Sequence, residues 1–159
     1  ASGRKGAFMR DCVDDLAAPS GVAGHTVLSA SNCLSADVGA ASDPTFADVN
    51  EPRNAAYVNY GPVILKFTGS RGKGGSNDAS AEYMGEVRRT LGAAGIVWQT
   101  AELGRVDLGG GGTVAAYIAE LDVDTIDIGV PVLSMHAPYE VTSKLDVYET
   151  YKAFCAFAK

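Results

Sequence analysis

Short apolar runs alternate with helix-like segments along most of this chain, and this alternation constrains the fold more than any other feature. The runs "PVILKF" (62–67), "GIVWQT" (95–100), "DTIDIG" (124–129) and "VPVLSMH" (130–136) have the length and β-branched content of strands. The intervening segments 79–91, 114–121 and 143–158 are expected to be helices. Strands that alternate with helices predict an α/β domain, a three-layer sandwich with a helix-covered central mixed sheet that is incomplete here.

Apolar spacing identifies the expected inner face of two of these helices. Tyr83, Val87 and Leu91 recur every four residues in the segment 79–91. In the last helix the expected stripe consists of Val147, Tyr151, Phe154 and Ala158.

The first third of the chain is less regular. A helix is expected over 5–17, because Phe8, Cys12 or Val13, and Leu16 share one stripe and prolines and glycines follow. A strand is expected over 27–34, followed by a long irregular stretch over 39–61. Two glycine-rich segments, 68–78 and 102–113, are expected to be loops, the first of them flexible. A long loop in a compact domain is usually functional or part of an interface.

Composition excludes several classes of function. The chain has 159 residues and a net charge of −6, so it lacks the basic surface that nucleic acid or an anionic membrane requires. No apolar run reaches the roughly 18 residues of a membrane span. Three widely spaced cysteines make neither a disulfide framework nor a zinc-finger pattern, which favours a reducing cytoplasm. The length suits one domain, and the start without Met suggests part of a longer protein.

Four polar residues lie where a predicted strand meets a loop: Asp37, Lys66, Asp107 and His136. Sites in open α/β sheets gather at the loops beyond strand ends, and Asp and neutral His are natural ligands of zinc and similar ions. Each residue also has a simpler interpretation. Asp37 could cap a turn, His136 could be a structural histidine, and Lys66 could be an edge residue with its ammonium group in water.

The glycine run Gly109–Gly112, with Thr113 and a helix after it, leaves three interpretations open. Backbone N–H groups at a helix start can hold an anion or stabilise a developing oxyanion. Alternatively, the glycines allow two backbones to cross closely. A nucleotide site has less support than any of these three interpretations, because "GSRGKGGS" is not a P-loop.

Four ordered segments resemble a known family. They are "CLSADVGAASDPTF", "KFTGSRGKGGSNDASAE", "GGGGTVA" and "DIGVPVLSMHAPYEVTSKLDVYETYKAF". Together they are similar to the C-terminal part of the aspartyl aminopeptidase/aminopeptidase I family, and to its bacterial aminopeptidase I branch in particular. The resemblance covers residues 6–157 and implies a metallo-aminopeptidase with two cocatalytic divalent ions, usually zinc, which cleaves N-terminal residues from peptides.

The resemblance also implies roles for individual residues. Asp37 in "SAD" matches a ligand of one metal ion, and His136 in "SMH" matches a ligand of the other. Gly111, Gly112 and Thr113 match a loop that lies against the substrate. Lys66 and Asp107 match polar positions that line the same cleft. Two neighbouring metal ions lower the pKa of the water between them and polarise the scissile carbonyl.

The remaining family motifs are absent from this sequence. It contains no His-x-Asp segment, no bridging Asp and no adjacent Glu-Glu pair, so the general base and three ligands are missing. Catalytic zinc normally has three protein ligands. We therefore expect residues 1–159 to be the C-terminal part of a catalytic domain, inactive in isolation and belonging to a homo-oligomer, a dodecamer in the family. The alternative is a non-catalytic fragment or assembly module whose glycine-rich and long loops make subunit contacts.

Overall fold

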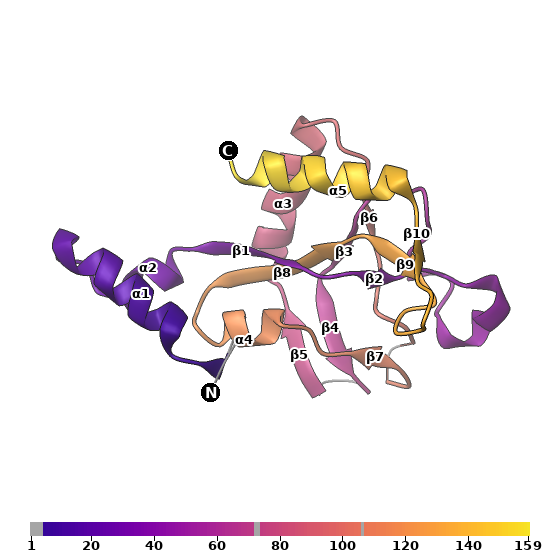
Figure 1. Ribbon diagram of the computed structural model, residues 1–159, viewed down its shortest axis with the longest axis horizontal. Helices are drawn as coiled ribbons and strands as arrows, with labels where there is room; N and C mark the ends of the chain where they lie inside the picture. The colour runs from indigo at the N-terminus through magenta and orange to yellow at the C-terminus, as the bar shows by residue number, and fades with distance from the viewer. Residues whose placement is uncertain (1–4, 72–73, 106) are drawn as a thin grey trace.

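The fold is built around a four-stranded sheet, shown in the computed structural model of Figure 1, which describes residues 5–71, 74–105 and 107–159. The strand order is β1 (Asn32–Ala36), β8 (Asp124–Gly129), β3 (Val63–Leu65) and β6 (Gln99–Thr100). β8 pairs parallel with β1 and antiparallel with β3, so the sheet is mixed. The predicted α/β class with a central mixed sheet is confirmed.

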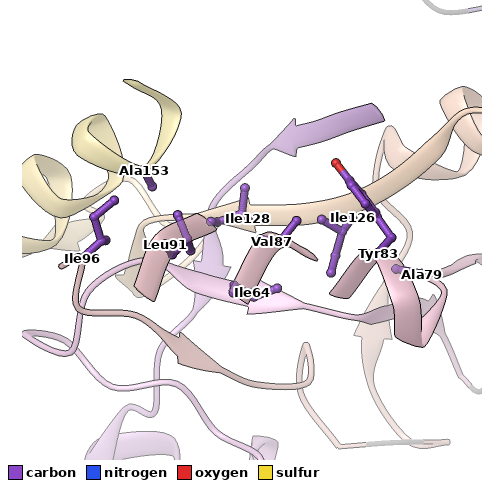
Figure 2. Packing of buried hydrophobic residues seen from close by; sticks show 9 residues of the cluster. All are labelled: Ile64, Ala79, Tyr83, Val87, Leu91, Ile96, Ile126, Ile128 and Ala153. Carbon is purple, nitrogen blue, oxygen red and sulfur yellow. The ribbon is translucent and has the colours of Figure 1, made fainter. Parts of the chain in front are cut away.

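Helices α3 (Ala81–Ala93) and α5 (Lys144–Phe157) cover one face of this sheet, and the short helix α4 (Ala115–Ala119) lies on the other side (Figure 1). The main core forms under α3, where the predicted stripe is confirmed. Figure 2 shows its members: Ile64, Ala79, Tyr83, Val87, Leu91, Ile96, Ile126, Ile128 and Ala153. Ile126 and Ile128 alternate along β8, so both point into this core.

The expected stripe of α5 is confirmed only at Phe154, which packs against the main core. Val147, Tyr151 and Ala158 are exposed, whereas the same helix buries Asp146, Thr150 and Ala153. The reason is a hydrogen-bonding requirement. The Asp146 carboxylate accepts from the backbone N–H groups of Asn59 (2.7 Å) and Gly61 (2.8 Å), and so fixes the end of the long irregular segment onto the helix. Apolar periodicity cannot reveal such a contact.

The segment 68–78, expected to be a flexible loop, is largely a β-hairpin. β4 (Phe67–Ser70) pairs antiparallel with β5 (Gly74–Asp78) and with β7 (Gly110–Gly111), which comes from the second glycine-rich segment. Glycine has low strand propensity, but pairing on both sides of β4 satisfies its backbone groups. Gly72 and Lys73 of the first expected loop, and Val106 of the second, lie outside the described residues.

A third sheet contains the two strands that precede and follow His136 in the sequence. It contains β10 (Val141–Thr142), β9 (Pro131–Leu133) and β2 (Gly39–Ala40), with β2 parallel to β9. The expected irregular stretch 39–61 is largely confirmed. Apart from β2, its regular part is the 3₁₀ segment η3 (Pro44–Val49), which Asp43 caps by accepting from the Thr45 N–H at 2.8 Å.

Two expected strands differ from the prediction. Of the strand predicted over 27–34, the first part belongs to helix α2 (Gly24–Ser29), and only the last part belongs to a strand, β1. α2 packs on α1 (Phe8–Ala17), which the 3₁₀ segment η2 (Ala18–Ser20) follows. A Cβ on Gly24 would lie 2.0 Å from the Asp14 carboxylate, so this close approach overrides the strand propensity of Val27.

Within "GIVWQT" only Gln99 and Thr100 join the sheet. The Val97 N–H donates instead to the Glu149 carboxylate of α5, at 3.1 Å, and the Gln99 side chain bonds the Tyr57 and Gly61 carbonyl groups. Side-chain partners therefore replace part of the expected ladder. The helix predicted over 5–17 is confirmed, but Phe8 and Leu16 are each 80% exposed. None of the helices in the described ranges is long and apolar enough to cross a membrane.

Replacing Asp146 tests the corrected orientation of α5. Asp146→Ala removes a charged acceptor from two backbone donors and should lower the free energy of unfolding by about 2–4 kcal/mol. Val147→Ala changes the neighbouring residue, which the expected stripe had placed in the core. This variant should change the free energy of unfolding by at most about 0.5 kcal/mol. Urea denaturation of both variants measures the difference. Equal losses would contradict the orientation described here.

Candidate functional site

His136 stands on a strained turn at the end of β9. Ser134 and His136 both have positive φ values, 57° and 68°. The Ala137 N–H donates to the Ser134 carbonyl at 2.9 Å, and the His136 N–H donates to the Glu140 carboxylate. Residues other than glycine adopt such angles at a cost of about 1 kcal/mol or more, and this strain concentrates at functional sites. The His136 ring is exposed beside a cavity.

The cavity beside His136 has a volume of about 550 Å³ and a mainly apolar lining. Its apolar side chains come from the segment 40–50, from Leu103 and from β9 with its turn. They include Phe46, Val49, Leu103, Val132 and Met135. Asp43 and Asn50 are polar lining residues, and none of the described residues that line the cavity is a lysine or an arginine. The cavity is therefore suited to an apolar group held close to an imidazole.

Asp37 lines a different cavity, of about 620 Å³, together with Gly112, Thr113 and residues of α4. It follows β1, its side chain is exposed, and its carboxylate accepts from the N–H of Val38 at 2.8 Å. That bond reaches only the next residue, in a segment between β1 and β2 that forms no turn, so it is a local contact and not the turn cap that the sequence left open. The structure thus lines one cavity with Asp37 and another with His136.

The glycine-rich segment adjoins both cavities. Gly109, Gly110 and Gly111 line the cavity with His136, and Gly112 and Thr113 line the one with Asp37. A Cβ on Gly110, whose φ is 84°, would lie 2.2 Å from the Gly69 carbonyl oxygen of β4. Close backbone crossing, one of the three interpretations of this run, therefore accounts for Gly110. The helix that follows has only five residues.

Lys66 and Asp107 are not lining residues of either large cavity. The Lys66 ammonium group pairs with the Asp78 carboxylate at 2.5 Å, and both side chains are partly exposed. Asp107 is exposed, has a φ of 68°, and adjoins a water-sized pocket of about 10 Å³ beside Arg105. Neither residue thus lines a cavity with His136 or Asp37, although the small pocket beside Asp107 shares Gly109 and Gly110 with the cavity beside His136. Their role in substrate binding stays a prediction.

One buried carboxyl group escaped the sequence analysis. Asp127 lies in the centre of β8 and is 0% exposed. Its Oδ2 accepts from the Thr113 hydroxyl at 2.9 Å and from the Thr68 hydroxyl at 3.4 Å. Its Oδ1 and the Ser35 hydroxyl, which faces it across β1 and β8, have no hydrogen-bond partner among the described residues. The available signal was a charged residue inside the apolar strand "DTIDIG".

Burial raises the pKa of Asp127 above its ordinary value of 3.8. The Ser35 hydroxyl, which lies beside the carboxyl group, and the Thr113 and Thr68 hydroxyls, which hydrogen-bond it, oppose this shift by stabilising the charged form, and the negative charge of Asp37 adds to it. The Asp127 carboxyl group is therefore easier to protonate in the folded chain than in the unfolded one.

The described residues do not form a metal centre by themselves. None of their clusters brings together three or more His, Cys, Asp or Glu side chains that could hold an ion. His136 and Asp37 each offer one suitable donor, from different cavities. Tight catalytic zinc sites need three protein ligands, so these residues alone do not fit one.

Comparison with known proteins identifies the family. The model of the family "Aminopeptidase I zinc metalloprotease (M18)" matches residues 1–158. This chain belongs to the M18 aminopeptidase family. A probable M18 family aminopeptidase 1 of Clostridium acetobutylicum is 54% identical over 127 residues, which are 80% of this chain and 27% of that protein. Its counterpart from Thermotoga maritima is 47% identical over 128 residues, 80% of this chain and 28% of that protein.

Several solved structures share the fold. The crystal structure of aminopeptidase I from C. acetobutylicum has a TM-score of 0.89 and 47% identity, and it covers 99% of this chain and 34% of that one. The T. maritima M18 structure has a TM-score of 0.92 and 40% identity, covering 99% and 36%. PhTET1-12s, a dodecamer, shares the fold with a TM-score of 0.60 and 20% identity over 85% of this chain and 37% of that one. Our chain thus spans roughly a quarter to a third of the relatives it matches.

The raised pKa of Asp127 predicts how stability changes with pH. The stability gained by holding this proton is fully present below the ordinary value of 3.8 and is lost as the pH rises through the raised folded-state pKa. Asp127→Asn cannot titrate at this position. The free energy of unfolding of the parent minus that of the variant should therefore decrease as the pH rises above 3.8.

Urea denaturation over a series of pH values measures this difference. Asp15→Asn, which removes an exposed carboxylate from α1, controls for the loss of one negative charge. A difference that stays constant or grows with pH in the Asp127→Asn comparison would overturn the assignment.

Proposed function

We propose that this chain is the C-terminal part of the catalytic domain of a metal-dependent aminopeptidase, which removes N-terminal residues from peptides at a site with two divalent ions, zinc being the expected metal. Family membership supports the reaction class. The observation that ties the proposal to a particular residue is the placement of His136, which is exposed on a strained turn beside an apolar cavity. In this proposal His136 and Asp37 each supply one ligand, and the other ligands come from outside residues 1–159.

The incomplete set of donors is consistent with the length comparison. The chain spans 27–28% of two curated relatives, so most of a relative's residues have no counterpart here. A metal ion in a complete site would lower the pKa of its bound water to near neutral pH. We infer that the protein forms a homo-oligomer, as its resemblance to the family implies. A cytoplasmic location stays a prediction from the cysteine pattern.

A second candidate function is a non-catalytic assembly module. The observation that favours it is the apolar surface left open on the helices. Phe8 and Leu16 of α1 are exposed, and Tyr148 and Tyr151 stack on the outer face of α5 with their ring centroids 6.3 Å apart. Exposed apolar patches of this kind mark interaction surfaces. Anion binding by the glycine-rich segment has less support, because close backbone crossing explains Gly110 and the helix is short.

The two histidines of this chain provide a matched test of the metal proposal. His136→Ala, made in the complete polypeptide that contains these residues, should lower the bound metal and reduce peptidase activity by at least about a hundredfold. His25→Ala removes the other histidine, which lies on α2 away from both cavities, and should change neither. Elemental analysis and hydrolysis of aminoacyl substrates measure both quantities. Full metal content and activity in His136→Ala would remove His136 from the site, and a parent without metal-dependent peptidase activity would favour the assembly module.

The cavity beside His136 predicts the kind of residue that is removed. With apolar walls and no cationic side chain among its described lining residues, it should accept a leucyl or methionyl N-terminal side chain better than an aspartyl one. Phe46→Ala should weaken this selectivity by about tenfold, because it deletes apolar contact with the side chain. Val97→Ala, at an exposed residue that lines neither cavity, is the control. A parent enzyme that prefers acidic N-terminal residues would show that this cavity does not hold them.

A further inference from the structure

Asp127 is an unusual residue to find at the centre of a sheet. Ile126 and Ile128 on either side of it pack in the apolar core, while Asp127 itself is 0% exposed on the opposite face. No cationic side chain among the described residues pairs with it. Burying a carboxyl group without a counter-ion lowers stability, and apolar residues of similar volume often stabilise such positions. Stability alone therefore does not explain an aspartate here.

The contacts of Asp127 converge on one residue of the glycine-rich segment. Oδ2 accepts from the Thr113 hydroxyl at 2.9 Å, and the Thr68 hydroxyl lies 3.3 Å from that of Thr113. Three side chains from β8, β4 and the end of the glycine run therefore form one buried polar contact. Gly109–Gly112 have no side chains that could fix their position, so Thr113 is the first residue after the run that side-chain bonds can hold.

We propose that Asp127 is a positioning residue that acts through Thr113. By accepting from the Thr113 hydroxyl, it holds the glycine-rich segment in place as a shared wall of the cavity with His136 and the cavity with Asp37. Its effect on catalysis rests on the proposed function, in which peptide substrate enters these cavities. Its effect on the segment itself does not depend on that function.

The competing explanation is that Asp127 only stabilises the fold, and the chain offers a matched control for it. Thr125 lies on the same strand, two residues earlier and therefore on the same face, and is 3% exposed. Its hydroxyl donates to the Val123 carbonyl at 2.9 Å and does not reach the glycine-rich segment. Thr125→Val thus deletes a buried hydrogen bond of the same sheet face without touching Thr113.

The experiment compares Asp127→Leu, which removes both acceptor oxygens at similar shape, with Thr113→Val, their double variant, Thr113→Ser and Thr125→Val in the complete polypeptide that contains these residues. Hydrogen–deuterium exchange of residues 109–114 measures local opening, and thermal unfolding measures stability. Exchange in this segment should rise at least about fivefold in Asp127→Leu and in Thr113→Val. It should stay at the parent level in Thr113→Ser, which keeps the hydroxyl, and in Thr125→Val.

Kinetics tests the link to catalysis. Asp127→Leu and Thr113→Val should each lower kcat/KM by about ten- to a hundredfold, since a displaced wall misplaces the substrate. The double variant should be no worse than the poorer single variant, because both changes break the same contact. Thr113→Ser should restore most of kcat/KM, and Thr125→Val should lower the melting temperature without lowering kcat/KM.

Three results would overturn the proposal: unchanged exchange of residues 109–114 in both single variants, additive losses in the double variant, or a loss of kcat/KM in Thr125→Val equal to that in Thr113→Val. If Asp127→Leu does not fold, the Thr113 pair still decides, because valine must open the segment and serine must not. A parent without peptidase activity would refute only the proposed function. The exchange data would still test whether Asp127 positions the glycine-rich segment.

Discussion

The burial of β8 on both faces is the constraint on which the rest of the structure depends. Its five residues from Thr125 to Gly129 are all buried, between β1 on one side and β3 on the other. Side chains of a strand alternate between the faces of its sheet. One face of β8 therefore completes the apolar core under α3, and the other presents Asp127 to the hairpin β4–β5 and the glycine-rich segment.

This division gives the two faces of the sheet different tasks. The face under α3 and α5 is closely packed and apolar, as Figure 2 shows, and it resists rearrangement. The opposite face is built from glycine-rich strands held by backbone pairing and by a few hydroxyl–carboxyl contacts. Both candidate cavities adjoin that second face through the glycine-rich segment. A closely packed apolar layer thus supports a more polar layer, where the proposed substrate contacts lie.

Much of the fold could be predicted from local pattern. The helix over 81–93 buries the predicted Tyr83, Val87 and Leu91, since apolar residues four apart share one helix face. The α5 stripe failed because the buried face of that helix is chosen by Asp146, which bonds backbone groups more than 80 residues away. The hairpin failed for a related reason, because pairing partners distant in sequence can impose strands on a glycine-rich segment.

The candidate site divides in the same way. Sequence alone determined the residue types: a histidine after an apolar strand, an aspartate in "SAD", and a glycine run before a threonine, which together resemble one family that the comparisons confirm. Tertiary structure alone decided which of these residues share a cavity, and it pairs Lys66 with Asp78. It also decided that Asp127 is buried against Thr113. Local sequence encodes chemistry and periodicity, whereas the distance between residues far apart along the chain is set by how the layers pack.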